Sequence, residues 1–248
     1  RLLRNLLNNQ DFEKQFANNM ADFLNSSFRA DILQNIYTDY QNQLEPNRLL
    51  QVNRWGYPSI ATTLIDRYAE TPSLTKWDVL NSALSTYLNS RQRYVFRHFM
   101  NYFNYSDTSR IVLDVSSSNE GIIQINSLLL TSETTGFSQY PWNGLYFQNV
   151  PVELTAFAKR GHRFDQWSNG QTNPYQSISL QSDSILVANF VIDSQYKEPH
   201  INEVLTENNW SEEDRYAQHE PWIEIYNPNN YPISLDGYFI TNNQNNPT

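Results

Sequence analysis

The sequence predicts a multidomain protein of mixed α and all-β class, in which an N-terminal helical bundle precedes two β domains. Three observations predict this order. Apolar residues recur with the 3.6-residue period of a helix over residues 1–109, and with a period of two from residue 110 onward. The charge is also uneven, because residues 193–248 hold two basic and ten acidic residues. We therefore expect domains at 1–109, 110–192 and 193–248, with net charges of +1, −2 and −8.

The composition excludes several classes of function. The 248-residue chain has no cysteine, so it has no disulfide, thiolate metal site or cysteine nucleophile. No apolar run approaches the roughly 18 residues of a membrane-spanning helix, so we expect no integral membrane segment. The net charge of −9 and the absence of a Lys and Arg cluster argue against nucleic acid as a partner.

Three helices are expected in the first part. A stripe of apolar residues predicts an amphipathic helix over 9–25, with Asn9 as its N-cap. A second helix is expected over 28–44, where Pro46 prevents its continuation, and we expect these two helices to form a hairpin. A third helix, with Thr75 as its N-cap, is expected to close the bundle.

Short strands bounded by turn residues are expected from residue 110 onward. In the second part they lie at 111–115, 121–125, 145–147, 152–158, 162–167 and 184–191. The Ser-Ser-Ser-Asn link after the first strand predicts that the first two form a hairpin. After a polar linker at 193–199, further strands are expected at 201–205, 222–226 and 238–240.

Motifs that carry catalysis are missing from the sequence. The four histidines are not spaced to share a metal, and the glycines form neither a phosphate-binding loop nor a nucleophile elbow. We therefore assign no catalytic, cofactor-binding or metal-binding residue. The carboxylates between Glu203 and Glu224 are dense, and we favour a solvated acidic face over an acid/base pair. A weak calcium site is an intermediate option, although the regular calcium loop is absent.

An aromatic group is the one candidate for a ligand platform. Tyr140, Trp142, Tyr146 and Trp167 would stack on sugar rings if they were exposed. Such aromatic side chains more often form the core of a small β domain. Burial of the rings decides between these readings.

The first part resembles the C-terminal helical part of the bacterial spore-coat CotH kinase family. The resemblance is carried by LLRNLLNNQDFEKQFANNMADFLNSSF at 2–28 and, further on, by Trp55, Gly56, Trp77 and the pair Arg93 and Tyr94. It implies a kinase-like protein that uses ATP and a divalent metal to phosphorylate exported proteins. The nucleotide-binding and catalytic residues of that family lie upstream of the matched part. The resemblance therefore implies ATP and metal for a longer parent protein, and no cofactor for this chain.

The second part resembles the divergent internalin-type repeat of bacterial surface proteins. An LTA…GxxFxxW…AxF pattern over 152–190 carries this resemblance, with Gly161, Phe164 and Trp167 at its centre.

The third part is similar to the opening of a lamin-tail domain, an immunoglobulin-like sandwich. Six residues match its framework and are expected to be structural: Asn202, Glu203, Trp222, Glu224, Asn227 and Gly237. Such a sandwich normally takes about 100 residues. We therefore expect the chain to end inside it.

These features together favour a non-catalytic C-terminal region of an exported, multidomain bacterial CotH-like protein. Its β modules would serve as spacer, attachment or protein-interaction domains at the cell surface or after secretion. The expected partners are other domains of the parent protein, another protein or a cell-surface polysaccharide. Two alternatives stay open: a carbohydrate-binding surface module, and a piece of an ATP-dependent protein kinase whose active site lies upstream.

Overall fold

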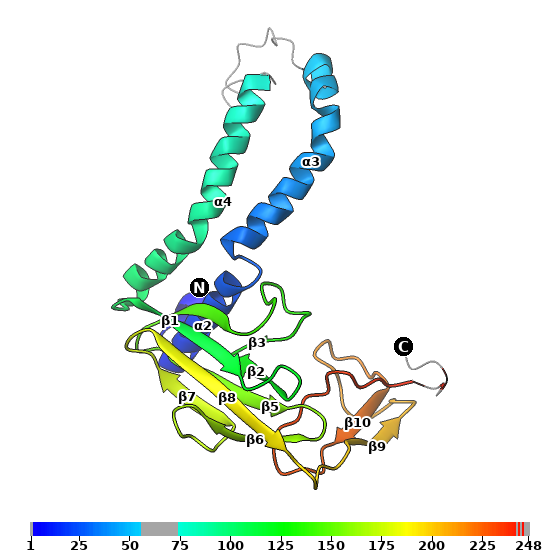
Figure 1. Ribbon diagram of the computed structural model, residues 1–248. Helices are drawn as coiled ribbons and strands as arrows, with labels where there is room; N and C mark the ends of the chain where they lie inside the picture. The colour runs from blue at the N-terminus through cyan, green and yellow to red at the C-terminus, as the bar shows by residue number, and fades with distance from the viewer. Residues whose placement is uncertain (1, 56–73, 242, 244, 246–248) are drawn as a thin grey trace. The chain divides into compact units, whose positions relative to one another are not determined.

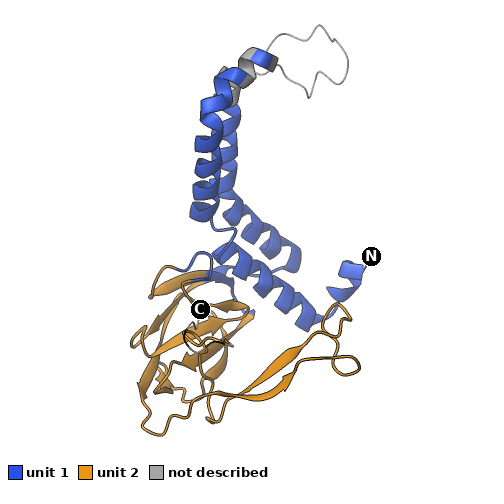
Figure 2. Cartoon of the chain, turned by 90° about the vertical axis from the view of Figure 1, so that its right-hand side faces the viewer, with its two compact units in different colours: residues 1–109, 133–137, 145–150 blue, residues 110–132, 138–144, 151–248 orange. Residues whose placement is uncertain are grey.

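The computed structural model describes residues 2–55, 74–241, 243 and 245, and shows a chain of mixed α and β structure (Figure 1). The chain divides into two compact units (Figure 2). Unit 1 comprises residues 1–109, 133–137 and 145–150, and unit 2 comprises the rest. The change of hydropathy period at residue 110 coincides with a boundary between units. The change of charge at residue 193 does not, because residues 151–248 belong to one unit.

Unit 1 begins with two helices, α1 (Leu2–Leu6) and α2 (Gln10–Asn25). The predicted N-cap of α2 is confirmed, since Asn9 Oδ1 accepts hydrogen bonds from the backbone N–H groups of Asp11 and Phe12 at 2.9 and 3.1 Å. These bonds satisfy donors that the first helical turn leaves without partners. One face of α2 is buried, including Ala17 and Leu24.

The next helix, α3 (Ala30–Trp55), continues through Pro46, so the predicted end at residue 44 is wrong. A proline inside a helix removes one backbone hydrogen bond. Side chains of α4 (Leu74–Phe103) hold α3 on both sides of this point. Before the proline, the Tyr37 hydroxyl donates to Asn81 Oδ1 at 2.8 Å. After it, Arg48 lies 3.1 Å from the Asp78 carboxylate. These contacts pair α3 with α4 on both sides of the proline.

The helical hairpin pairs α3 with α4, not α2 with α3 as expected (Figure 1). With 30 residues, α4 is long enough to pack on α3 through its first half and on α2 through its second. In the second half, the ring of Phe99 stacks on Phe16 with centroids 5.6 Å apart. The predicted N-cap Thr75 lies inside α4, since the helix already includes Leu74.

A pair of four-stranded sheets, in the orders β4-β1-β8-β6 and β3-β2-β5-β7, lies largely in unit 2, and residues 145–147 at the end of β4 belong to unit 1. Most pairs are antiparallel, and β1 pairs with β8 in parallel. The strands are β1 (Thr108–Val115), β2 (Gly121–Ile125), β3 (Leu128–Leu129), β4 (Trp142–Phe147), β5 (Pro151–Ala158), β6 (His162–Trp167), β7 (Tyr175–Ser179) and β8 (Ser184–Ile192). The positions of β3 and β7 were not predicted.

The expected hairpin between β1 and β2 is wrong, because these strands belong to different sheets. The backbone of Ser116 continues the pairing of β1 with β8, as its N–H donates to the Ala188 carbonyl at 2.9 Å. The chain then crosses to the second sheet before Gly121. A Cβ added at Gly121 would lie 2.1 Å from Cζ of Phe190 on β8, so the two sheets meet closely at this glycine.

The last part of unit 2 holds a two-stranded antiparallel ribbon of β9 (His200–Leu205) and β10 (Trp222–Tyr226). The expected strand at 238–240 is wrong. Tyr238 follows a turn, in which its N–H donates to the Leu235 carbonyl, and Phe239 and Ile240 are exposed.

No helix in the described residues combines the length and apolar character that a membrane crossing needs.

Candidate functional site

Three of the four aromatic residues proposed as a sugar platform are buried, and the fourth, Tyr140, is half-buried. The exposed fraction is 4% for Trp142 and 0% for both Tyr146 and Trp167. The Tyr140 hydroxyl accepts a hydrogen bond from the Ile123 N–H at 2.8 Å and donates to the Leu130 carbonyl. These rings therefore form core and do not present a surface, so the carbohydrate platform built on them is wrong.

Tyr146 instead takes part in a buried polar cluster of unit 1. Its hydroxyl donates to Oδ1 of Asp22 at 2.8 Å, and Asp22 is 2% exposed. Burial raises the pKa of Tyr146 well above its usual value, and the Asp22 carboxylate raises it further. Beside this pair, Asn25 bonds both the N–H and the carbonyl of Leu145. The cluster anchors the segment 145–150 to α2.

The residues that carry the resemblance in the helical part are only partly described. Arg93 stacks on the ring of Tyr94 at 5.4 Å, and this contact lies on the surface of α4. Trp55 and Trp77 lie in helices, but their side chains and Gly56 are outside the described structure.

The repeat-like residues occupy structural positions in unit 2. Gly161 has a φ of +76°, which favours glycine, and it forms the turn between β5 and β6. Phe164 is 7% exposed and packs on Trp167, with ring centroids 5.6 Å apart. The Trp167 indole N–H donates to the Asn173 carbonyl at 3.2 Å.

The lamin-tail-like residues are spread over the ribbon and its following loop. Asn202 donates a hydrogen bond to Glu224, and Glu203 lies opposite Glu224 in the β9–β10 register. Trp222 begins β10. Gly237, with a φ of +83°, lies in the turn that follows.

Asn227 organises that loop from its first position. Its side-chain amide donates to the Tyr231 carbonyl at 2.9 Å, and its Oδ1 accepts from the Asn229 backbone at 3.0 Å.

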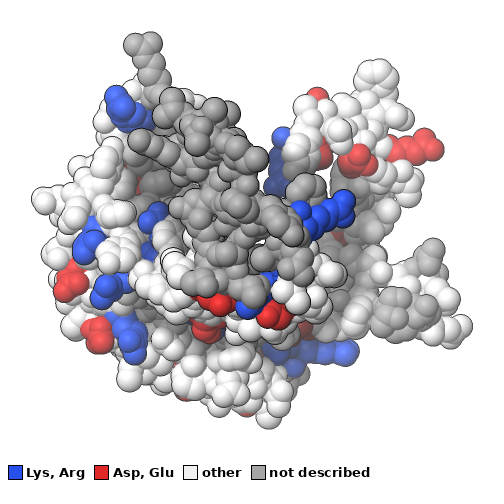
Figure 3. Space-filling view, turned by 90° about the horizontal axis from the view of Figure 1, so that it is seen from above, with Lys and Arg blue, Asp and Glu red and all other residues white. Residues whose placement is uncertain are grey.

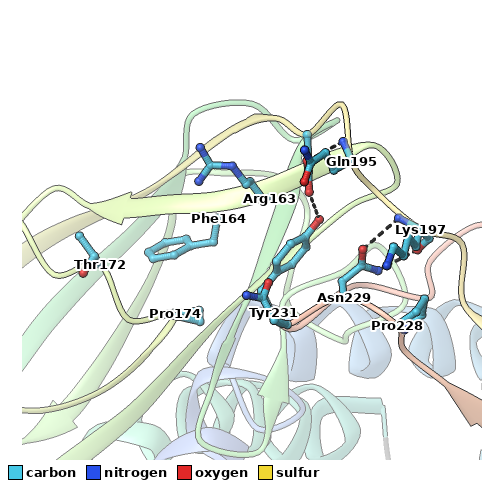
Figure 4. A pocket seen from close by; sticks show the side chains of 11 residues that line it. Arg163, Phe164, Thr172, Pro174, Gln195, Lys197, Pro228, Asn229 and Tyr231 are labelled. Atoms are coloured by element: carbon cyan, nitrogen blue, oxygen red, sulfur yellow. Dashed lines mark hydrogen bonds between the residues drawn. The ribbon is translucent and has the colours of Figure 1, made fainter.

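The loop closes one side of a cavity of about 580 Å³ in unit 2 (Figure 4). The other sides come from the start of β6, from the loop at 172–174 and from the linker at 193–197. In the view of Figure 4, Tyr231 stands between Arg163 and Lys197. Phe164 and Pro174 add apolar surface to the wall.

Two sets of hydrogen bonds hold the linker against the loop. The Asn229 side chain makes two hydrogen bonds with the Lys197 backbone. Asn229 Oδ1 accepts from the Lys197 N–H at 2.9 Å, and the Asn229 side-chain amide donates to the Lys197 carbonyl at 2.7 Å. The Tyr231 hydroxyl donates to Oδ2 of Asp193 at 2.5 Å. This bond lowers the pKa of the Asp193 carboxyl below its usual range. The protein's own hydrogen bonds therefore hold these two walls together.

The cavity was missed by sequence reasoning because its walls come from segments far apart in the chain. Residues 193–199 were predicted to be a polar linker. That prediction rests on their composition, which does not indicate the contacts of Asp193 with Tyr231 and of Lys197 with Asn229. The only local signal is Asn227-Pro228-Asn229-Asn230, which is typical of a turn. Nothing in that run indicates that Asn229 reaches Lys197.

Acidic residues of the segment between β9 and β10, among them Glu213 and Asp214, line a second cavity of about 540 Å³ together with Trp222 of β10. The Asp214 carboxylate caps its own turn, accepting from the N–H groups of Tyr216 and Gln218. Glu213 lies 3.6 Å from His219. Within the described residues, no three carboxylate or histidine side chains are placed to hold one metal ion.

Comparisons with known proteins add no relative to this picture. No family model matches the chain, and no curated protein or solved structure matches it either. Its class is accordingly defined by its own fold, which is a mixed α and β protein with a helical hairpin and mostly antiparallel sheets.

Proposed function

We propose that this chain is a non-catalytic region of an exported, multidomain bacterial protein, in which the β modules serve as spacer and attachment domains. The observation that carries the proposal is the seam that joins residues 193–241 to the eight-stranded part of unit 2. A spacer has to hold consecutive modules in a fixed arrangement. Contacts along the whole junction between two modules would provide that property.

The seam begins with backbone pairing beside the end of β5. The N–H of Ala158 donates to the Pro232 carbonyl at 3.2 Å, and the N–H of Ser234 donates to the Ala158 carbonyl at 2.7 Å. Ser234 is 5% exposed, and Ala158 is fully buried. These two bonds tie the C-terminal segment directly to a central strand.

Charged side chains extend the seam at the surface. Lys159 lies 2.8 Å from Asp236, and Arg160 lies 2.6 Å from Glu198. The Tyr238 hydroxyl donates to Glu198 at 2.7 Å and also bonds the Tyr196 hydroxyl. Exposed ion pairs stabilise by less than about 1 kcal/mol each, so their role is mainly to fix the register of the two surfaces.

The β9–β10 ribbon supports an attachment role. Four of its apolar side chains are 40–52% exposed, namely Ile201, Val204, Ile223 and Ile225. Each strand pairs with one neighbour in the described structure, so each has an open edge. Open edges and exposed apolar side chains are features of interaction surfaces. We propose that the ribbon contacts another domain of the same parent protein.

Catalysis gives the first test of the proposal. The chain is incubated with radiolabelled ATP, magnesium and a protein acceptor, and its unfolding temperature is measured with and without magnesium-ATP. We expect no label transfer above the level of the heat-denatured chain and no change of unfolding temperature. Transfer that rises in proportion to the amount of folded chain would overturn the non-catalytic proposal.

Self-association gives a second test, because an open ribbon without its partner domain is expected to pair with a second copy. Light scattering should give a mass that rises above 29.1 kDa with concentration. Ile223→Lys should abolish the rise, and Ile185→Lys should not, since Ile185 is a 70% exposed residue on β8. A strict monomer at all concentrations would count against an attachment role of the ribbon.

A further inference from the structure

The cavity beside Tyr231 has the size and composition of a small-ligand site. Its volume of about 580 Å³ falls within the roughly 300–1,000 Å³ of typical ligand pockets. Its walls combine two cations, a buried ring and several neutral polar groups. We propose that it binds an acidic saccharide, meaning a sugar that bears a carboxylate.

The charges of the walls favour an anionic ligand. Arg163 and Lys197 line the cavity against one carboxylate, that of Asp193. Asp193 already accepts hydrogen bonds from the Tyr231 hydroxyl and, at 2.9 Å, from the Gln195 N–H. Its oxygens are therefore engaged by the wall itself. A positive charge remains available to a ligand.

Both cations are accessible in the described structure. The Arg163 side chain is 48% exposed, and its ion pair with Asp165 is long, at 4.0 Å. The Lys197 backbone is held by Asn229, while its ammonium group makes no ion pair within the described residues. On the face shown in Figure 3, the blue Lys and Arg side chains are scattered and form no continuous patch.

Apolar and neutral polar groups of the walls fit a sugar ring. The side chains of Phe164, Tyr231 and Pro174 line the cavity and offer apolar surface for the C–H face of a pyranose. The side chains of Thr172, Gln195 and Asn230 have no hydrogen-bond partner within the described structure and line the same space. Hydroxyl groups of a sugar both donate to and accept from such groups.

The mixed composition of the walls favours a saccharide over a compact anion, because apolar and neutral polar side chains line the cavity beside the two cations. In the view of Figure 4, Tyr231 separates Arg163 from Lys197. A saccharide that bears a carboxylate would place that group on one of the two cations, and its hydroxyls would meet the neutral polar side chains of the walls. This inference goes beyond the proposed function, because a spacer and attachment role requires no saccharide.

The test uses trigalacturonate as the acidic saccharide, with neutral trigalactose and inorganic phosphate as comparisons. Binding to the full chain is measured by calorimetry and by backbone amide shifts. We expect saturable binding of trigalacturonate, at least about tenfold tighter than either comparison. The shifts should centre on residues 163–164, 193–197 and 228–231.

Variants localise the binding. Arg163→Gln and Lys197→Gln should each weaken it about tenfold, because each removes one charge-assisted contact. The matched control is Arg215→Gln, a cation of the same acidic segment that stacks on Tyr216 outside the cavity. That variant should bind normally, and all three should keep the unfolding temperature of the parent.

Three outcomes would overturn the inference. These are an absence of saturable binding, equal binding of trigalactose or phosphate, and an equal loss in Arg215→Gln. The last result would indicate attraction to overall charge. None of them affects the catalysis test above, so failure of the saccharide site and failure of the proposed function are distinguishable.

Discussion

The Tyr146 hydroxyl donates a hydrogen bond to Oδ1 of Asp22 at 2.8 Å, and neither side chain is more than 2% exposed. The pair joins residues separated by 124 positions in the chain. It shows that a strand segment of the β-rich part is integrated into the helical unit. Phe147 on the same segment supports this, since its ring stacks on Phe99 with centroids 5.8 Å apart.

Removing the Tyr146 hydroxyl should destabilise unit 1. Tyr146→Phe takes a hydrogen bond from a buried carboxylate, which costs about 1–3 kcal/mol of unfolding free energy. The measurement is urea unfolding at pH 7. The control is Tyr175→Phe, which alters a 57% exposed tyrosine and should change the free energy by less than about 0.5 kcal/mol. Equal stability of the two variants would show that the Asp22 contact contributes nothing.

A methyl group at Gly121 should disrupt the contact between the two sheets. The added Cβ would lie 2.1 Å from Phe190 Cζ, and the Phe190 ring is 5% exposed. We expect Gly121→Ala to lower the unfolding free energy by about 1–3 kcal/mol, as overpacked cores do. Adding Phe190→Leu should recover part of the loss. A double variant that shows simple additivity would contradict the proposed overlap.

Replacing the proline inside α3 should stabilise the helical hairpin. Pro46→Ala restores a backbone N–H that can bond the carbonyl four residues earlier, and it removes the steric conflict of the ring. We expect greater helical circular dichroism and a gain of about 1–3 kcal/mol in unfolding free energy. A loss of helicity would mean that the proline ring itself packs favourably.

The Asp193 carboxyl should titrate below its ordinary value of 3.8. The hydrogen bond from Tyr231 favours its ionised form, so the folded-state pKa lies below that of the unfolded chain. The bond therefore stabilises the fold above the unfolded-state pKa, and this contribution is lost as the pH falls through the folded-state pKa.

An NMR titration of the Asp193 carboxyl carbon measures this effect directly. Tyr231→Phe should return the midpoint toward the ordinary value. A midpoint that is the same in both proteins would show that the hydroxyl does not set the pKa.

Local pattern predicted much of the secondary structure. The helical period and the Asn9 cap placed α2 correctly, because both depend on residues close in sequence. Pairing between elements was predicted poorly. The Ser-rich link after β1 permits either a hairpin or a crossing between sheets, and the close approach of Gly121 to Phe190 favours the crossing.

For the candidate sites too, residue types could be recognised from the sequence, whereas contacts between distant segments could not. Aromatic residues such as Trp167 were noticed by their type, but their exposure depends on the tertiary fold. The cavity depends on the contact of Asn229 with Lys197, which are 32 residues apart. Neither residue has a sequence context that indicates the other.

The central claim is that residues 193–241 and the eight-stranded part of unit 2 form one rigid attachment unit. Hydrogen exchange at the seam tests it most directly, through the backbone N–H groups of Ala158 and Ser234. We predict that the Ser234 amide is protected as strongly as that of Leu154 on β5 and more strongly than the amide of Val204 in the ribbon. Exchange of the Ser234 amide at the rate of an unprotected loop would contradict the claim.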